Sequence, residues 1–309
     1  MKRHFFIILI GLMTAGLITG CGISNKEQKE KTRMAAAEMR RIDSLAFKMA
    51  VTPTLDCLPV FVAKECHFFD TLGVQVHLKP MNAQMDIDEA LRKGQVECGV
   101  TDVMRAERMK KKGVPLSYLT STNAYWQLFS NKKSRIKELR QLGDKMIAMT
   151  RYSATDYLAT MALDSVKPDN PVFRIQINDV TIRLKMLQNN EMDAVLLPEP
   201  QATTARIENH PIHMDSRGRD LRLGAVVVRN TVYTDEHRKK QLDAFKIAYD
   251  QACDSINQYG LRHYTGIIKQ YCQTDDRTVS ALPKLTFSHI TPPREKDINK
   301  TKNVKWRTH

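Results

Sequence analysis

The segment AVLLPEP, residues 194–200, places a carboxylate directly after an apolar run of strand length. The run from Ala194 to Leu197 suits a strand that is covered on both faces of a parallel sheet. Glu199 follows the run, at the edge where open parallel sheets bind their ligands. This position favours a binding carboxylate, although a solvated loop glutamate would give the same pattern.

Other polar residues follow other predicted strands at the same carboxyl edge. These candidates for ligand contact are Thr52, Thr54, Leu55, Asn82, Gln84, Thr101 and Asp102. Ser153 and Thr155 open a predicted helix, where backbone N–H groups and a hydroxyl could hold a ligand oxygen or simply cap the helix. Asn123 and Tyr125 lie where the chain is expected to cross between two halves, so they could also line a cleft.

The predicted charges bear on the class of ligand. The carboxylates of Asp102 and Glu199 would repel an anion and would suit a ligand with N–H donors or positive charge. Arg105 or Arg151 could neutralise either acid, which leaves the ligand class open. The aromatic residues that could stack on a ring, or pack in the core instead, are Tyr125, Trp126 and Tyr152.

No pattern for catalysis accompanies these residues. Ser153 is not in a G-x-S-x-G motif, and no glycine-rich phosphate loop follows the first predicted strand. The histidines and cysteines lack the spacing of metal ligands, although Cys253 and Cys272 could form a disulfide. We therefore expect a binding protein, with no enzyme activity, cofactor or metal.

The N-terminus predicts export. Lys2 and Arg3 precede an apolar stretch from Phe5 to Leu17, and this arrangement is typical of a secretion signal over residues 1–20. The alternative, an uncleaved anchor, is less favoured because the stretch is shorter than the ~20 residues that span a bilayer. The sequence ITGC resembles the lipobox of bacterial lipoproteins, which implies lipidation of Cys21. Residues 24–33, SNKEQKEKTR, are charged without an apolar period, which predicts a flexible tether within a lipidated segment over 21–44.

The chain is strongly basic, with a formal net charge of +14 over 309 residues. Export argues against nucleic acid as the partner, so anionic lipid headgroups suit the basic excess better. Part of the excess lies in the runs RMKKKG (108–113) and HRKK (237–240), which are typical of solvated helix faces.

Apolar runs of strand length alternate with amphipathic helical segments, which predicts two α/β halves. In the first half we expect strands over 45–51, 74–81, 97–100 and 115–121, with helices over 58–69, 87–94 and 103–113. In the second half we expect strands over 146–150, 173–177 and 192–197, with helices over 136–143, 154–163 and 181–190. A strand over 221–230 and helices over 239–260 and 261–272 follow, and these helices are expected to return to the first half.

The order of motifs resembles the type II substrate-binding proteins of ABC importers. LDCLPVFVAKECHFFDTLGVQVHLKP is similar to the family opening G-F-F-x-x-x-G-V-x-V, although Cys66-His67-Phe68-Phe69 lacks the usual glycine before the aromatics. EALRKGQVECGVTD and NNEMDAVLLPEPQATTA resemble the family stretches A-L-x-x-G-x-x-D-x-x-x-x-D and G-x-x-D-A-x-x-x-x-E-P. Relatives of this kind bind sulfonates, taurine, nitrate or the pyrimidine precursor of thiamin.

The resemblance implies an α/β periplasmic-binding-protein fold with two lobes joined by a two-strand hinge. Its expected bounds are 45–126 with 224–285 for the first lobe, 127–223 for the second and 286–309 for an irregular or packed tail. It also implies a monomer, lipid-anchored outside a bacterial membrane, that delivers a small solute to an ABC permease and its ATPase. The acids favour a thiamin precursor, with a sulfonate, taurine or nitrate as the alternative. A scaffolding or sensing lipoprotein and a pyrimidine-modifying enzyme on the same fold are the remaining alternatives.

Overall fold

The computed structural model describes residues 25–304 and 306, which divide after Leu45 into two compact units. The predicted signal peptide, residues 1–20, and the predicted lipidation at Cys21 lie outside the described residues. Among the helices that are described, none has both the length and the apolar character needed to cross a membrane.

The first unit contains helix α2 (Asn25–Leu45), so the prediction of a flexible tether over 21–44 is wrong for these residues. The segment is rich in alanine, glutamate, lysine, arginine and methionine, and it has neither glycine nor proline, so helix propensity favours a helix. Glu38 and Arg41 add an ion pair at 2.7 Å, three residues apart on the exposed helix surface.

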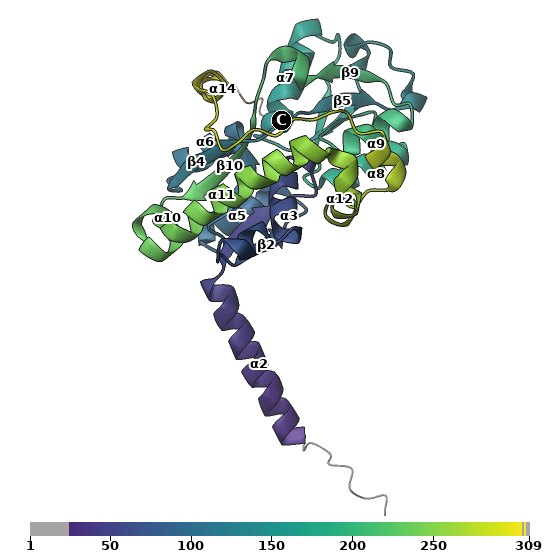
Figure 1. Cartoon of the computed structure of the whole chain (residues 1–309). Coiled ribbons are helices and arrows are strands. Elements are labelled where there is room, and N and C mark those ends of the chain that lie inside the picture. Colours follow the sequence, from purple (N-terminus) through teal and green to yellow (C-terminus); the bar gives the residue numbers. More distant parts are fainter. Residues whose placement is uncertain (1–24, 305, 307–309) are drawn as a thin grey trace, which may run out of the picture. The chain divides into compact units, whose positions relative to one another are not determined.

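The second unit is built on two mixed five-stranded sheets (Figure 1). The first sheet has the order β2 (Val76–Pro80), β1 (Phe47–Val51), β3 (Cys98–Asp102), β10 (Gly224–Arg229), β4 (Leu116–Ser121). The second has the order β7 (Phe173–Gln176), β6 (Met146–Met149), β8 (Ala194–Leu197), β5 (Gln127–Ser130), β9 (Ile212–Asp215). We call the halves built on these sheets lobe 1 and lobe 2, and we keep the predicted bounds as our working division.

The sheets are mixed because the chain passes twice between the lobes. Strand β10 returns directly from lobe 2 and runs antiparallel to β3 and β4, and β5 enters lobe 2 and runs antiparallel to β8 and β9. Neither strand follows a helical crossover, which is what a parallel arrangement requires. The crossing segments, 122–126 and 220–223, meet where the Thr122 N–H donates to the Gly224 carbonyl at 2.9 Å.

Helices cover both faces of each sheet. Their bounds are α3 (Leu58–Glu65), α4 (Phe68–Thr71), α5 (Gln84–Lys93), α6 (Val103–Lys111), α7 (Ala154–Val166), α8 (Val180–Gln188), α9 (Gln201–Ile207), α10 (Thr231–Thr234), α11 (Glu236–Tyr259), α12 (Thr265–Cys272), α13 (Asp276–Ser280) and α14 (Glu295–Lys300). In β1, Phe47 and Met49 join the core under α3 and α11, whereas Ala50 joins the core under α5 and α6. This alternation follows from the two-residue period of a strand.

Several expected elements differ from the structure. The helix predicted over 58–69 is interrupted at His67, whose φ of 60° is left-handed, at the place where the related motif has glycine. The helix predicted over 136–143 is a single 3-10 turn, Leu139–Leu142, and β9 was not predicted. Cys253 and Cys272 are buried free thiols, so the suggested disulfide is absent.

The C-terminal tail contacts both lobes (Figure 1, yellow). At lobe 1, the Ser121 N–H donates to the Thr291 carbonyl at 2.7 Å. At lobe 2, Arg294 pairs with Asp220 at 2.7 Å, and Trp306 meets the Tyr152 ring edge-on with centroids 5.5 Å apart. The part of the tail described here is therefore packed and includes helix α14.

We expect Gly224→Ala to lower the free energy of unfolding by about 1–3 kcal/mol, the usual cost of overpacking. A Cβ at residue 224 would lie 2.2 Å from Thr122 Oγ1 and 2.6 Å from Ala124 Cβ, both on the first crossing segment. Urea unfolding measures the change. Gly218→Ala is the control, because its Cβ would meet nothing within 4 Å, and equal effects of the two substitutions would contradict the prediction.

Candidate functional site

A cavity lies between the lobes at the carboxyl ends of β1, β2 and β3, with about 40 Å³ of room for the centres of water molecules. Six residues predicted from the sequence line it: Thr52, Thr54, Asn82, Gln84, Thr101 and Thr155. The remaining lining residues are Asp56, Val100, Ala124, Trp126, Asn178, Val180, Arg183 and Pro198. Polar side chains from both lobes therefore meet at one small space.

Two polar atoms of this cavity have no hydrogen-bond partner in the described structure, Thr101 Oγ1 and Asn178 Oδ1. Thr101 is the last residue but one of β3 and is only 3% exposed, so its hydroxyl is held away from bulk water. A buried polar atom without a partner costs free energy, which a ligand atom in the cavity would recover.

The charged groups of the cavity are Asp56 and Arg183, and neither was predicted. Asp56 follows residues 52–55, which we call the TPTL loop. Its carboxylate accepts a hydrogen bond from Thr122 Oγ1 at 3.3 Å. Burial raises the pKa of the Asp56 carboxyl above its ordinary value, so the carboxyl is less acidic than in water.

Arg183 comes from helix α8 and is 3% exposed. Its guanidinium donates to the carbonyls of Leu196 at 2.5 Å and Ile177 at 2.7 Å, and to Thr150 Oγ1 at 2.9 Å. Burial lowers the pKa of Arg183 to about 10. Within the described residues no carboxylate forms an ion pair with Arg183, so neutral oxygens, two backbone carbonyls and the Thr150 hydroxyl, stabilise this cation. The sequence pattern does not reveal the burial of Arg183, because this arginine lies in an ordinary amphipathic helical run.

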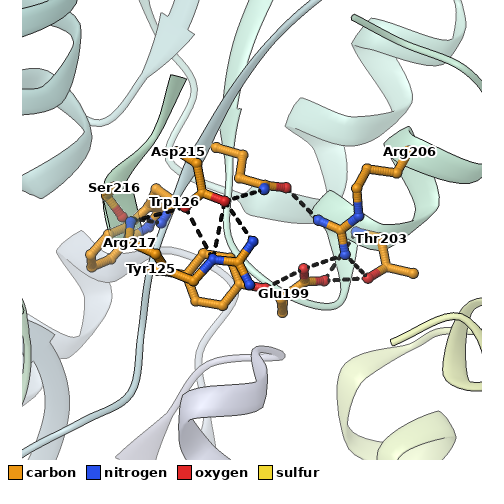
Figure 2. A network of polar contacts seen from close by, with 9 residues as sticks. Tyr125, Trp126, Glu199, Thr203, Arg206, Asp215, Ser216 and Arg217 are labelled. Atoms are coloured by element: carbon orange, nitrogen blue, oxygen red, sulfur yellow. Dashed lines mark hydrogen bonds and ion pairs between the residues drawn. The ribbon is translucent and has the colours of Figure 1, made fainter. Parts of the chain in front are cut away.

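The Glu199 carboxylate does not line this cavity but is 4% exposed in a separate polar network (Figure 2). It accepts hydrogen bonds from Tyr125 OH at 2.6 Å, Thr203 Oγ1 at 2.6 Å and the Thr203 N–H at 3.0 Å. Arg206 forms an ion pair with it at 2.5 Å. Burial, followed by the nearby Glu199 charge, raises the pKa of Tyr125. Because these partners occupy both carboxylate oxygens, the residue joins the first crossing segment to α9.

The other predicted site residues lie outside the main cavity too. Leu55, Asn123 and Tyr125 line, together with Glu199, an adjoining space of about 10 Å³ that shares Asp56 with the main cavity. Tyr152 has the Arg108 guanidinium over its ring, 3.9 Å from the centroid, and lines a different cavity.

Asp102 and Ser153 are helix caps. Asp102 Oδ1 accepts from the Arg105 N–H at 3.0 Å, Oδ2 has no partner in the described structure, and burial raises the pKa of Asp102 to about 6. Ser153 Oγ accepts from the Thr155 N–H at 3.1 Å and donates to the Thr150 carbonyl at 2.7 Å. The capping alternative considered from the sequence thus describes Ser153, whereas the cap at Asp102 was not expected.

Direct contacts join the lobes around the cavity. The Leu55 N–H donates to the Glu199 carbonyl at 2.9 Å, and Gln201 Nε2 donates to the Pro53 carbonyl at 2.9 Å. On the other side, a bridge pairs Ala83 with Asp179. These bonds define a closed arrangement. No group of three or more metal-ligating side chains occurs in the part of the chain that the structure describes.

Solved structures share this fold at low sequence identity. The alkanesulfonate-binding protein SsuA from Xanthomonas axonopodis pv. citri, bound to MOPS, is 14% identical, with 83% of this chain and 90% of that chain covered and a TM-score of 0.69. The nitrate-binding protein NrtA from Synechocystis PCC 6803 is 15% identical over 75% and 68% of the two chains, with a TM-score of 0.64. The Candida albicans CA3427 product, described as having the generic periplasmic binding protein fold, is 13% identical over 84% and 88%, with a TM-score of 0.64.

No curated protein matches the sequence. A family model described as NMT1/THI5 like matches residues 54–255, which is more than half of the chain. The resemblance inferred from the motifs is thus confirmed for the family, and the structural likenesses confirm the fold. The chain belongs to the NMT1/THI5-like family and has the α/β periplasmic-binding-protein fold with two lobes.

Proposed function

We propose that the protein is the extracytoplasmic solute-binding component of an ABC importer. The observation that carries this proposal is the cavity between the lobes, where polar side chains of both lobes meet and two buried polar atoms lack partners. Such a site can hold a small solute without any chemical step. The family and the structural neighbours, which include an alkanesulfonate-binding and a nitrate-binding protein, support the same role.

As the solute we favour an aminopyrimidine of the thiamin-precursor type. Asp56 and Asn178 Oδ1 offer acceptors for N–H donors, and the Trp126 ring forms part of the wall. From the sequence we expected Asp102 and Glu199 to accept hydrogen bonds from the N–H groups of the solute. In this proposal Asp56 accepts them instead. A ring requires the lobes to separate further than in this closed arrangement, because the present cavity has room for only a few water molecules.

A sulfonate- or nitrate-type anion is the second candidate, and Arg183 favours it. A buried guanidinium without a carboxylate partner lines the cavity, and the small volume suits a compact anion. The neutral backbone carbonyls around Arg183 leave its positive charge available to an anion.

Solute capture would proceed by closure of the lobes, followed by docking of the closed form on a permease with its ATPase. A solute that contacts both lobes only when they are closed shifts the population towards that state. In this proposal the protein is a monomer that is anchored through a lipid on Cys21 to the outer side of a bacterial membrane. A scaffolding or sensing lipoprotein is expected to bind no solute. A pyrimidine-modifying enzyme is expected to release its solute chemically changed.

The test is a thermal-shift screen of the form lacking residues 1–21 against aminopyrimidines, sulfonates, taurine and nitrate. A solute that binds only the folded state raises the melting temperature. Mass analysis of the recovered solute distinguishes binding from catalysis, because a binding protein returns its solute unchanged. No shift with any compound would argue for the scaffolding or sensing alternative.

Asp56→Asn should weaken binding of an aminopyrimidine by about tenfold or more, since a charge-assisted hydrogen bond contributes about 1.5–3 kcal/mol. The same change should leave nitrate binding equal or stronger, because it removes a negative charge from the cavity. Isothermal titration calorimetry measures both affinities. Asp243→Asn, on the exposed side of α11, serves as the control, and an unchanged aminopyrimidine affinity would remove Asp56 from the site.

Glu199→Gln should lower the free energy of unfolding by about 1–3 kcal/mol, because it leaves the buried Arg206 pair incomplete. The relative affinities for different solutes should stay the same, since Glu199 lies outside the main cavity. Urea unfolding and calorimetry measure the two effects, with the exposed Glu236→Gln as control. If the variant kept its unfolding free energy but lost affinity only for amine-bearing solutes, Glu199 would be a ligand contact after all.

Asp102→Asn should make stability less dependent on pH between about 4 and 6. The raised pKa means that the folded state binds more protons than the unfolded state in this window, so wild-type stability falls as pH rises. The wild-type protein should lose about 2–3 kcal/mol of unfolding free energy across this window, because each unit of pKa difference corresponds to about 1.4 kcal/mol. The variant, which has no carboxyl at this position, should not show that loss. Unfolding curves across the window measure this, and parallel pH profiles for the two proteins would contradict it.

Asp275→Asn supplies a control of opposite sign. This exposed cap of α13 has its pKa lowered by the Thr278 N–H, so the wild-type carboxylate favours folding more as pH rises through its titration.

A further inference from the structure

A second cavity, of about 850 Å³, shares no lining residue with the proposed solute cavity. It is lined from lobe 1 by α5 and α6 and from lobe 2 by Arg151, Tyr152 and Gln176. Its cationic side chains are Arg92, Arg105, Arg108, Lys112 and Arg151, and its acidic ones are Asp86, Asp88 and Glu89. The run of basic residues at 108–113, interpreted from the sequence as a solvated helix face, supplies two of these cations.

Two of the acids are already engaged by two of the cations. Arg105 forms an ion pair with Asp88, and Arg92 forms one with Glu89 at 2.6 Å. Lys93 also contacts Glu89, at 2.9 Å. These pairs leave Arg108, Lys112 and Arg151 opposite Asp86 as the only other acid of the lining, so the cavity carries an excess of positive charge.

Arg151 contributes a buried donor to this cavity. Its Nε atom is buried and has no hydrogen-bond partner in the described structure. The backbone carbonyl of Arg151 accepts a hydrogen bond from Arg105 Nη1 at 3.4 Å. Arg108, from the other lobe, lies over the neighbouring Tyr152 ring at 3.9 Å from the centroid. Cationic side chains of both lobes therefore line the same cavity, Arg108 and Lys112 from lobe 1 and Arg151 from lobe 2.

We propose that this second cavity is a binding site for a small oxyanion of the phosphate or sulfate class. Guanidinium groups bind such oxygens through paired N–H donors, and the buried Nε of Arg151 supplies a donor that no group in residues 25–304 and 306 accepts. The site takes residues from both lobes, so an anion bound there neutralises the repulsion between them and stabilises the closed arrangement. By linkage, the same anion strengthens binding of any solute that requires closure.

The test titrates the full chain, purified in mild detergent, with inorganic phosphate at constant ionic strength and follows its melting temperature. Phosphate should raise the melting temperature, whereas chloride should not. Arg151→Gln should raise the apparent Kd for phosphate about tenfold or more, the loss of a charge-assisted hydrogen bond. Arg151→Lys should lose less because it keeps the charge. The matched control is Lys111→Gln, on the exposed side of α6 and outside the cavity lining, which should behave as wild type.

A flat phosphate titration, an equal response to chloride, or a wild-type response of Arg151→Gln would overturn the proposal. If Arg151→Gln fails to fold, the exposed Lys112→Gln variant provides the same comparison, with weaker phosphate binding expected. Flotation with phosphatidylglycerol vesicles separates the two sources of a phosphoryl group. Vesicle binding that depends on Arg151, without a response to free phosphate, would overturn the soluble-anion assignment in favour of a lipid headgroup. None of these readouts requires a solute in the first cavity, so they test the second site independently of the proposed import function.

Discussion

The buried Glu199 carboxylate is the interaction on which the join between the lobes depends. A carboxylate removed from water is costly unless its oxygens are satisfied, and here Tyr125, Thr203 and Arg206 satisfy them. The network fixes the end of β8 against the first crossing segment. From that fixed position, the Glu199 carbonyl accepts the Leu55 N–H and so holds the TPTL loop over the cavity. The shape of the cavity thus follows from a polar network that lies beside it.

The electrostatics of the cavity explain why composition alone cannot identify the solute. Asp56 and Arg183 both line it, but burial makes the acid less acidic and the cation less basic. Each charge is also moderated by neutral partners, a hydroxyl for Asp56 and backbone carbonyls for Arg183. Acceptors and donors are therefore both present, and the preference of the site depends on which of them the closed lobes direct at the solute.

The sequence predicted the alternation of strands and helices, because the apolar runs and the helix stop at Gly94 are local signals. The direction of β5 and β10 could not be predicted in this way, since it depends on the partners that each strand finds after a crossing. For the site, six of the predicted residues line the cavity because strand ends share one edge. Glu199 also follows its strand as expected, but the direction of its side chain depends on Arg206 and Tyr125, which no local pattern reveals. Arg183 was missed because a buried arginine and an exposed one look identical in a helical run.

The C-terminal tail gives the molecule a third connection between the lobes, besides the two crossing segments. Thr291 is bonded to lobe 1 and Arg294 to lobe 2, with only residues 292 and 293 between them. An exposed ion pair such as Arg294 with Asp220 is weak by itself. The short spacer, however, keeps the broken pair at a high effective concentration, so it re-forms as an intramolecular event. Because Ile298 and Trp306 also pack against the core cluster that includes α7, several weak contacts hold the tail together, and each one keeps the others within reach when it breaks.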